Sequence, residues 1–330
     1  MSPGRLPAVL LFRAGLAACA LPLAGLFAPL PDGLLALVAP GALVLGMALA
    51  LTVGCPDAAF ARRTSKWLLQ GAVVLLGFGL DLRQVLTAGA QGMAFALVSI
   101  AAVFALGELL RRRLGIRPLT SLLVSSGTAI CGGSAIAAMA SVTDAPQEDV
   151  SVAVGTVFLL NAVALLVFPP LGHALGLSPE QFGMWAGIAI HDVSSVVGAA
   201  TAFGGDSLAT ATAVKLSRVL YLTPVVLMVA AAGRRRAGGT GGAGNRAPLP
   251  WFIALFLLAS LVRSLVPALA PHAGQVKLVA VSGFAAALYL IGSGITRATL
   301  AAVGARPLLQ GVLLWVFMAL AALAAVRAAG

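Results

Sequence analysis

The stretch Ser125-Ser126-Gly127-Thr128-Ala129-Ile130-Cys131-Gly132-Gly133-Ser134 is a polar, glycine-rich break in a segment, Pro118 to Val142, that is otherwise apolar. A helix that is broken at membrane depth leaves backbone N–H and C=O groups without partners, and hydrocarbon cannot supply them. Such a break survives where it lines a cavity or a bound solute. The stretch therefore predicts a binding site inside a membrane protein.

The composition of the 330-residue chain supports this interpretation. Hydrophobic residues make up 60% of the chain and charged residues 9%, whereas a soluble domain is about 25% charged. We therefore expect an all-α integral protein of the inner (plasma) membrane. The net charge of +11 does not indicate a nucleic-acid partner, because the cations form short clusters between apolar runs rather than one basic face.

Apolar runs long enough to cross about 30 Å of hydrocarbon recur along the chain. Together with two segments that carry polar centres, Pro118 to Val142 and Gln181 to Phe203, they predict about 9–11 membrane elements in one polytopic transporter domain, residues 1–330. We expect the first run to remain as a span rather than to be removed as a signal. The uninterrupted runs are Val9 to Pro29, Gly33 to Thr52, Trp67 to Leu86, Ala90 to Leu110, Val150 to Leu171, Leu208 to Ala232, Trp251 to Leu269, Val276 to Ile295 and Pro307 to Val326.

Lysine and arginine gather in the segments between these runs. Counting crossings places all the clusters on one side, which by the positive-inside rule is the cytoplasm. We therefore expect a cytoplasmic N-terminus, a C-terminus outside, and a flexible, glycine-rich cytoplasmic linker over residues 233–249. The clusters are Arg62, Arg63 and Lys66; Arg111, Arg112, Arg113 and Arg117; Arg234, Arg235, Arg236 and Arg246; and Arg297 and Arg306.

The chain also repeats itself. Gly77-Phe78-Gly79-Leu80 matches Gly292-Ser293-Gly294-Ile295, in helices expected to run in opposite directions, and Ala129-Ile130 matches Ala189-Ile190. These matches predict inverted repeats in which two interrupted elements meet near the midplane. Charge leaves open whether each element crosses the membrane as a broken helix or returns as a re-entrant hairpin, because later spans keep the same orientation in both cases.

Three stretches together resemble a known family. They are Gly127 to Ala138 around the first break, Ala189-Ile190-His191-Asp192-Val193-Ser194-Ser195 and the residues up to Ala200, and Val214-Lys215-Leu216-Ser217-Arg218-Val219-Leu220. Over nearly the whole chain the sequence resembles the YeiH-type sulfate exporter family. The resemblance implies an architecture similar to that of the cation/proton antiporter and anion transporter group, and sulfate as the exported solute.

The residues of the first break suit an anion. Gly132 and Gly133 permit close backbone approach, and hydroxyl groups of Ser126, Thr128 and Ser134 surround Cys131. A helix that restarts at Ser134 would direct free N–H groups and the positive end of its dipole into the break. The alternative is a contact between closely packed helices, which small residues also permit.

Lys215 and Arg218 lie about one turn apart on one face of the apolar span from Leu208 to Ala232. Cations inside a bilayer are costly and mark a functional site by default, so we expect them, with Ser194 and Ser195 of the second break, to bind the anion. The alternative for Lys215 is snorkelling from the end of the span.

Four other polar residues are candidates for supporting roles. His191 beside Asp192 could carry a coupling proton, or Asp192 could neutralise one of the cations while His191 only donates hydrogen bonds. Asn161 and Tyr221 either line the cavity or bridge helices. The coupling ion, H⁺ or Na⁺, stays open.

These observations predict a secondary transporter that moves a small anion by alternating access, with sulfate, a related sulfur oxyanion or an organic anion as substrate and membrane lipids as surroundings. An anion channel and an ion-coupled symporter or antiporter for another small solute are the alternatives. No cofactor, metal or enzymatic activity is expected, because Cys19, Cys55 and Cys131 lie far apart and no nucleophile or HExxH motif is present. A homodimer is left open.

Overall fold

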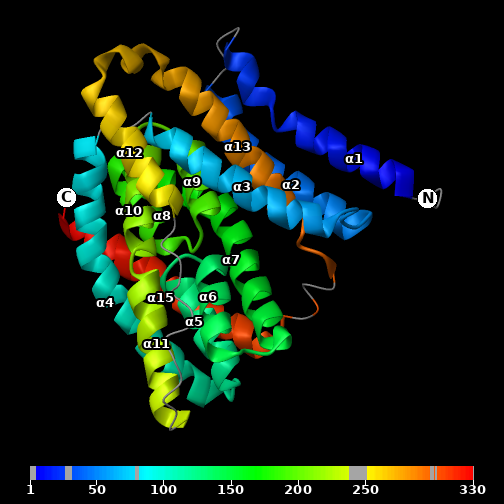
Figure 1. Ribbon diagram of the computed structural model, residues 1–330, viewed down its shortest axis with the longest axis vertical. Helices are drawn as coiled ribbons and strands as arrows, with labels where there is room; N and C mark the ends of the chain where they lie inside the picture. Colours follow the sequence, from blue (N-terminus) through cyan, green and yellow to red (C-terminus); the bar gives the residue numbers. More distant parts are fainter. Residues whose placement is uncertain are drawn as a thin grey trace.

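A computed structural model describes residues 5–26, 32–78, 82–237, 251–297, 301 and 303–329, and every regular element within them is a helix (Figure 1). This confirms the predicted all-α fold. Within the described residues, four short apolar helices accompany six helical stretches that are long and apolar enough to cross a membrane. The six are Pro7–Leu26, Val85–Leu114, Gln147–Ala174, Ser207–Ala232, Ala273–Ser293 and Ala305–Ala328.

The N-terminal helices pack with a helix from the second half of the chain. Helices α2 and α3 lie against α13, and α1 runs beside them (Figure 1). Gly46 and Gly292 let α2 and α13 approach so closely that a Cβ at either position would meet the other helix's backbone. The bounds are α1 (Arg5–Ala18), η1 (Leu21–Leu26), α2 (Asp32–Thr52), α3 (Ala58–Gly77) and α13 (Ala273–Ser293).

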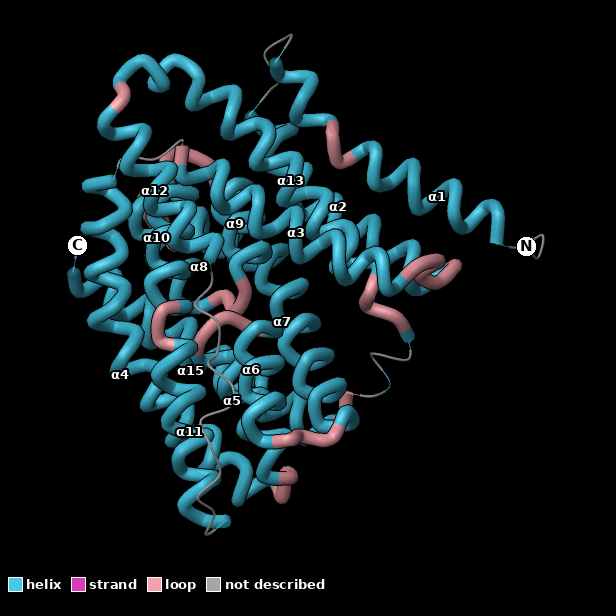
Figure 2. Tube along the Cα trace, viewed as in Figure 1, coloured by secondary structure: helices cyan, strands magenta, loops and turns pink. Residues whose placement is uncertain are grey.

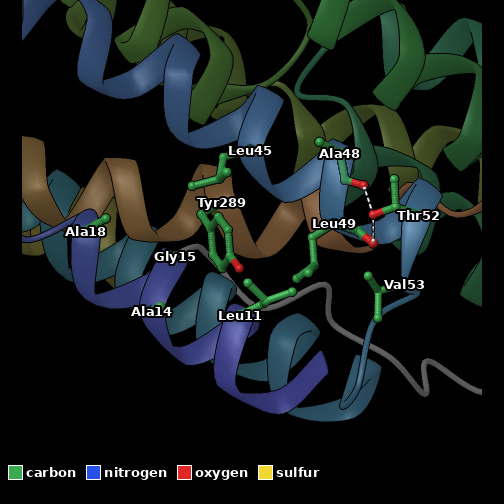
Figure 3. A pocket seen from close by; sticks show the side chains of 10 residues that line it. All are labelled: Leu11, Ala14, Gly15, Ala18, Leu45, Ala48, Leu49, Thr52, Val53 and Tyr289. Carbon is green, nitrogen blue, oxygen red and sulfur yellow. Dashed lines mark hydrogen bonds between the residues drawn. The ribbon is translucent and has the colours of Figure 1, made fainter. Parts of the chain in front are cut away.

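A groove of about 450 Å³ opens between α1 and α2, with the ring of Tyr289 from α13 in its wall (Figure 3). Its two hydroxyl groups are engaged elsewhere: Tyr289 donates to the carbonyl of Phe12 at 3.1 Å, and Thr52 to that of Ala48 at 2.6 Å. The groove is therefore apolar, and it shares no residue with either interrupted segment.

The predicted span from Trp67 to Leu86 is wrong as a single helix. Helix α3 ends at Gly77 and α4 begins at Leu82. Two glycines and an aspartate lie close together in the sequence at this point, and all three disfavour a helix interior. The remaining long elements are α4 (Leu82–Leu114), α7 (Gln147–Ala174), α12 (Trp251–Leu265), η2 (Pro267–His272) and α15 (Ala305–Ala329).

The predicted span from Leu208 to Ala232 is also interrupted. Helix α10 (Ser207–Val219) ends one turn before Pro224, and α11 (Leu222–Ala237) continues the path. Pro224 has no N–H for the carbonyl of Leu220, and its ring clashes with that carbonyl, so the helix breaks there. Residues 233–237, which we expected to be linker, belong to α11, and the rest of that linker lies outside the described residues.

The first interrupted segment is a hairpin of α5 (Pro118–Ala129) and α6 (Gly133–Thr143). Its outer ends lie together, because Arg117 pairs with Glu148 at 3.0 Å and Asp149 at 3.1 Å, and Thr120 donates a hydrogen bond to Asp149. The hydrogen bond to Glu148 and the charge of Asp149 raise the pKa of Arg117. Both acids begin α7, which follows α6 after residues 144–146, so the segment returns to the end from which it started.

The second interrupted segment is also a hairpin, made of α8 (Pro179–Ala189) and α9 (Val193–Phe203). A Cβ added to Gly205, just after α9, would lie 2.8 Å from the ring of Pro179 at the start of α8. The alternative of two broken helices that cross the membrane is therefore wrong.

The two hairpins enter the molecule from opposite ends. Helix α5 runs parallel to α7, because Thr120 bonds Asp149 near the start of both helices and Gly127 packs on Val157 about two turns further along both. Helix α8 runs antiparallel to α7, since Phe168 stacks on Trp185 at 4.2 Å and Gly172 packs on Phe182. An inverted repeat would produce this arrangement, and the repeat itself stays a prediction.

Single cysteines should report the hairpins directly, in a background without native cysteines. Cysteines that replace Arg117 and Glu148, at the two ends of the first hairpin, should react with a membrane-impermeant thiol reagent added on one side of the membrane. Cysteines that replace Glu180 and Asp206, at the two ends of the second hairpin, should react with the reagent added on the other side. Reaction of the two members of a pair from different sides would show that the segment between them crosses.

Candidate functional site

The first break closes α5 with a turn that requires glycine. The N–H of Ile130 bonds to the carbonyl of Ser126 at 3.1 Å, and the N–H of Gly132 to that of Gly127 at 2.9 Å. Gly132 has φ +66° and ψ −129°, a region that residues with a Cβ avoid. Helix α6 starts at the next residue without a side-chain cap, so its first N–H groups face the break.

The second break is held by side chains. The carboxylate of Asp192 caps α9 by accepting the N–H of Ser195 at 3.3 Å and the hydroxyl of Ser194. The N–H of His191 donates to the side-chain oxygen of Asn161, in the middle of α7, at 3.1 Å. Polar side chains thus replace the helical hydrogen bonds that are lost where α8 ends.

The two breaks lie against each other inside the helical bundle (Figure 2). A Cβ added to Gly132 would lie 3.1 Å from the Cβ of Asp192 and 3.5 Å from Val157 of α7. The expectation that the breaks approach one another is confirmed by this contact. The hairpins therefore bring four helix ends to one place, namely the C-termini of α5 and α8 and the N-termini of α6 and α9.

Arg218 of α10 forms a hydrogen bond to the backbone of the first break. Its side chain is fully buried, and its guanidinium donates to the hydroxyl of Ser99 on α4 at 3.1 Å and to the carbonyl of Ala129 at the end of α5. A cation suits this carbonyl, because helix C-termini carry partial negative charge. Arg218 therefore links three helices and satisfies a backbone acceptor that the break leaves free.

Lys215 is buried as deeply as Arg218 but does not form comparable hydrogen bonds. It is 1% exposed, and among the described residues its ammonium group takes part in no ion pair or hydrogen bond. It lies close enough to Cys131, Asp192 and Arg218 to interact electrostatically with all three. Burying a lysine side chain that has no partner is costly.

Further polar atoms around the breaks are buried without a hydrogen-bond partner. Native proteins leave few such atoms, so a cluster of them calls for an explanation, and a bound water, ion or ligand is one. They are Oγ1 of Thr128, Nδ2 of Asn161, both ring nitrogens of His191, Oγ1 of Thr212 and Nε of Arg218.

The structure brings most of the predicted site residues to this junction and places others elsewhere. The hydroxyl of Ser126 donates to the carbonyl of Leu123 within its own helix at 2.9 Å, so it is not free for a ligand. Ser134 is exposed, and Gly133 packs against Phe158. Those at the junction are Thr128, Cys131, Gly132, Asn161, His191, Asp192, Ser194, Ser195, Lys215 and Arg218.

Of the two roles left open for Tyr221, lining the cavity or bridging helices, the structure shows a contact of the second kind. Tyr221 lies in the interruption between α10 and α11, and its hydroxyl donates to the carbonyl of Met93 at 3.2 Å in an exposed position. It bridges two helices, which is the other role considered for it.

Sequence reasoning missed three buried polar residues, of which Ser99 bonds a side chain of the junction. Ser99 holds Arg218 from 119 positions away, a link that no local pattern reveals. Thr212 precedes Lys215 by one turn, so helical spacing could have identified it. Gln310 of α15 donates to the hydroxyl of Ser121 at 2.6 Å and to the carbonyl of Gly107 at 3.2 Å, and its position within an apolar span was the available signal.

Known proteins resemble the chain over most of its length. A family model described as "Conserved hypothetical protein 698" matches residues 9–311. A UPF0324 membrane protein of Bacteroides thetaiotaomicron is 42% identical over 86% of this chain and 85% of its own length. The UPF0324 membrane protein Bd1437 of Bdellovibrio bacteriovorus is 45% identical over 86% and 87%. No solved structure matches the chain.

Gly132→Ala should lower the stability of the protein by about 1–3 kcal/mol, because alanine does not adopt this backbone conformation without strain and its Cβ would press on Asp192 at 3.1 Å. Thermal unfolding of purified protein in detergent measures the change. Gly41→Ala in α2 is the control, since its Cβ meets nothing within 4 Å and alanine favours helix. Equal unfolding temperatures for the two variants would contradict the proposed strain at the break.

Proposed function

The chain belongs to the UPF0324 membrane protein family, and we propose that it is a secondary transporter that moves a small anion by alternating access. The observation that carries this proposal is Lys215, whose side chain is 1% exposed and forms no ion pair or hydrogen bond among the described residues, beside the junction of two helix breaks. The enclosure of the junction and the donors around it supply further support.

An anion resolves the unfavourable features of the junction together. It would neutralise the ammonium of Lys215 and could accept hydrogen bonds from Nδ2 of Asn161, the hydroxyl of Thr128 and the first N–H groups of α6. Asp192 does not take this role, because its carboxylate caps α9 and forms no ion pair among the described residues. We therefore assign substrate binding to Lys215, with Thr128, Cys131, Gly132 and Asn161 around it.

Enclosure of the junction favours a transporter over a channel. Lys215, Arg218, His191 and Ser194 are each at most 1% exposed, whereas residues that line an open pore would be reached by solvent. Two hairpins that meet tip to tip from opposite ends form a barrier at the site, and alternating access would open one side at a time. An anion channel remains the second candidate function.

We assign the coupling role to His191. Both of its ring nitrogens are buried and without partners, and the charges of Lys215 and Arg218 oppose its protonation unless an anion lies beside it. A proton taken up there would travel beside the anion. Ser194 receives no catalytic role, because its hydroxyl is bound to Asp192. We propose sulfate, another sulfur oxyanion or a small organic anion as substrate, and the inner membrane as location.

Anions should stabilise the purified protein through Lys215. Those of sulfate, sulfite, methanesulfonate and acetate that bind should raise the free energy of unfolding of the wild type by about 2.7 kcal/mol at one hundred times Kd, and its unfolding temperature should rise accordingly. Lys215→Met should abolish this response without lowering the stability of the anion-free protein, because replacing a buried charge by an apolar side chain is often neutral or stabilising.

Lys66→Met, at an exposed position on α3, is the matched control and should keep the response. A full anion response in Lys215→Met would refute the assignment. Flux of a stabilising anion in liposomes then separates the two candidate functions, since a transporter saturates and depends on a counter-ion whereas a channel gives large conductance.

A further inference from the structure

We infer that the junction selects a singly charged anion over a doubly charged one. This inference rests on the proposed function, because it concerns the same site. It follows from two observations on the described residues: the sum of the charges around the two breaks, and the groups that already compensate each charge.

Three side chains at the junction are charged in their ordinary ionised forms: Lys215 and Arg218 are then positive and Asp192 negative, so their formal charges sum to +1. The other titratable groups there are the imidazole of His191 and the thiol of Cys131, which are uncharged in their ordinary neutral forms. The acids nearest in the chain are at the outer ends of the hairpins. Asp149 is paired with Arg117 there, and Asp144, Glu148, Glu180 and Asp206 are exposed.

Helix ends do not change this balance. Two helix N-termini and two C-termini meet at the junction, so their partial charges of opposite sign offset one another. Arg218 faces the carbonyl of Ala129 at a C-terminus, and Asp192 caps the N-terminus of α9. Each of these two charges therefore stabilises a helix end of opposite polarity, and Lys215 is the charge that remains without one.

One negative charge on the anion neutralises the charge of Lys215. A second negative charge would be left uncompensated in the protein interior, where charges are poorly screened. A dianion that entered the site would need an additional positive charge. The junction is thus built for a monoanion such as a sulfonate, a carboxylate or a singly protonated sulfur oxyanion.

Methanesulfonate and sulfate make a matched pair of probes, because both are tetrahedral sulfur oxyanions and they differ in one unit of charge. Calorimetric titration of the purified full-length protein at pH 7, in a zwitterionic buffer without chloride, should give methanesulfonate an affinity at least about tenfold higher than that of sulfate. Sulfate binding as tight as methanesulfonate binding in the wild type would overturn the inference while leaving the proposed function in place.

Asp192→Asn raises the sum to +2 and keeps a residue that caps helices well. It should improve sulfate affinity relative to methanesulfonate by at least about tenfold, and an unchanged ratio in folded protein would also overturn the inference. Asp206→Asn is the control, because Asp206 likewise precedes a helix but is exposed and its side chain makes no capping bond.

If Asp192→Asn does not fold, the wild-type comparison alone decides. Failure of the wild type to bind either probe, together with the absence of any response to the other anions, would instead reject the proposed anion site itself.

Discussion

The contact between Gly132 and Asp192, where two interrupted helices meet, is the constraint on which the rest of the structure depends. A break in the interior of an apolar bundle frees backbone donors and acceptors that neither hydrocarbon nor packed side chains can satisfy. Each break here is satisfied by groups from other helices. The guanidinium of Arg218 donates a hydrogen bond to the carbonyl of Ala129, and the side-chain oxygen of Asn161 accepts one from the N–H of His191. The neighbouring helices therefore do more than enclose the breaks: they supply the hydrogen bonds that the broken helices have lost.

This arrangement explains why two cations on one helix have different roles. Arg218 is directed at the end of α5 and at Ser99, so its removal would leave a buried acceptor unpaired and loosen three helices. Lys215 makes no such bond among the described residues and contributes charge. A buried charge that stabilises nothing in the folded protein lowers its stability, and the proposed anion would compensate that charge. Stability and function are thus divided between neighbouring turns of α10.

The sequence predicts the composition of the site better than its geometry. Glycine, serine, histidine and aspartate inside apolar segments are visible without any structure, and they identified both breaks correctly. Whether the first segment crosses or returns is decided by Arg117 meeting Asp149, a contact between residues 32 positions apart that charge counting does not detect. Helix phase decided that Ser126 bonds its own helix and that Ser134 points outward. The link from Arg218 to Ser99 is a tertiary contact and has no local pattern at all.

The central claim is that the junction of the two breaks holds an anion next to Lys215, and perrhenate tests it most directly. Perrhenate is a singly charged tetrahedral oxyanion whose rhenium atom scatters X-rays anomalously. Crystals of the wild-type protein grown with perrhenate should show one strong anomalous peak between the breaks, within direct contact of the Lys215 ammonium, and crystals of Lys215→Met should lack it. Peaks confined to the exposed arginine clusters, with an empty junction, would contradict the account.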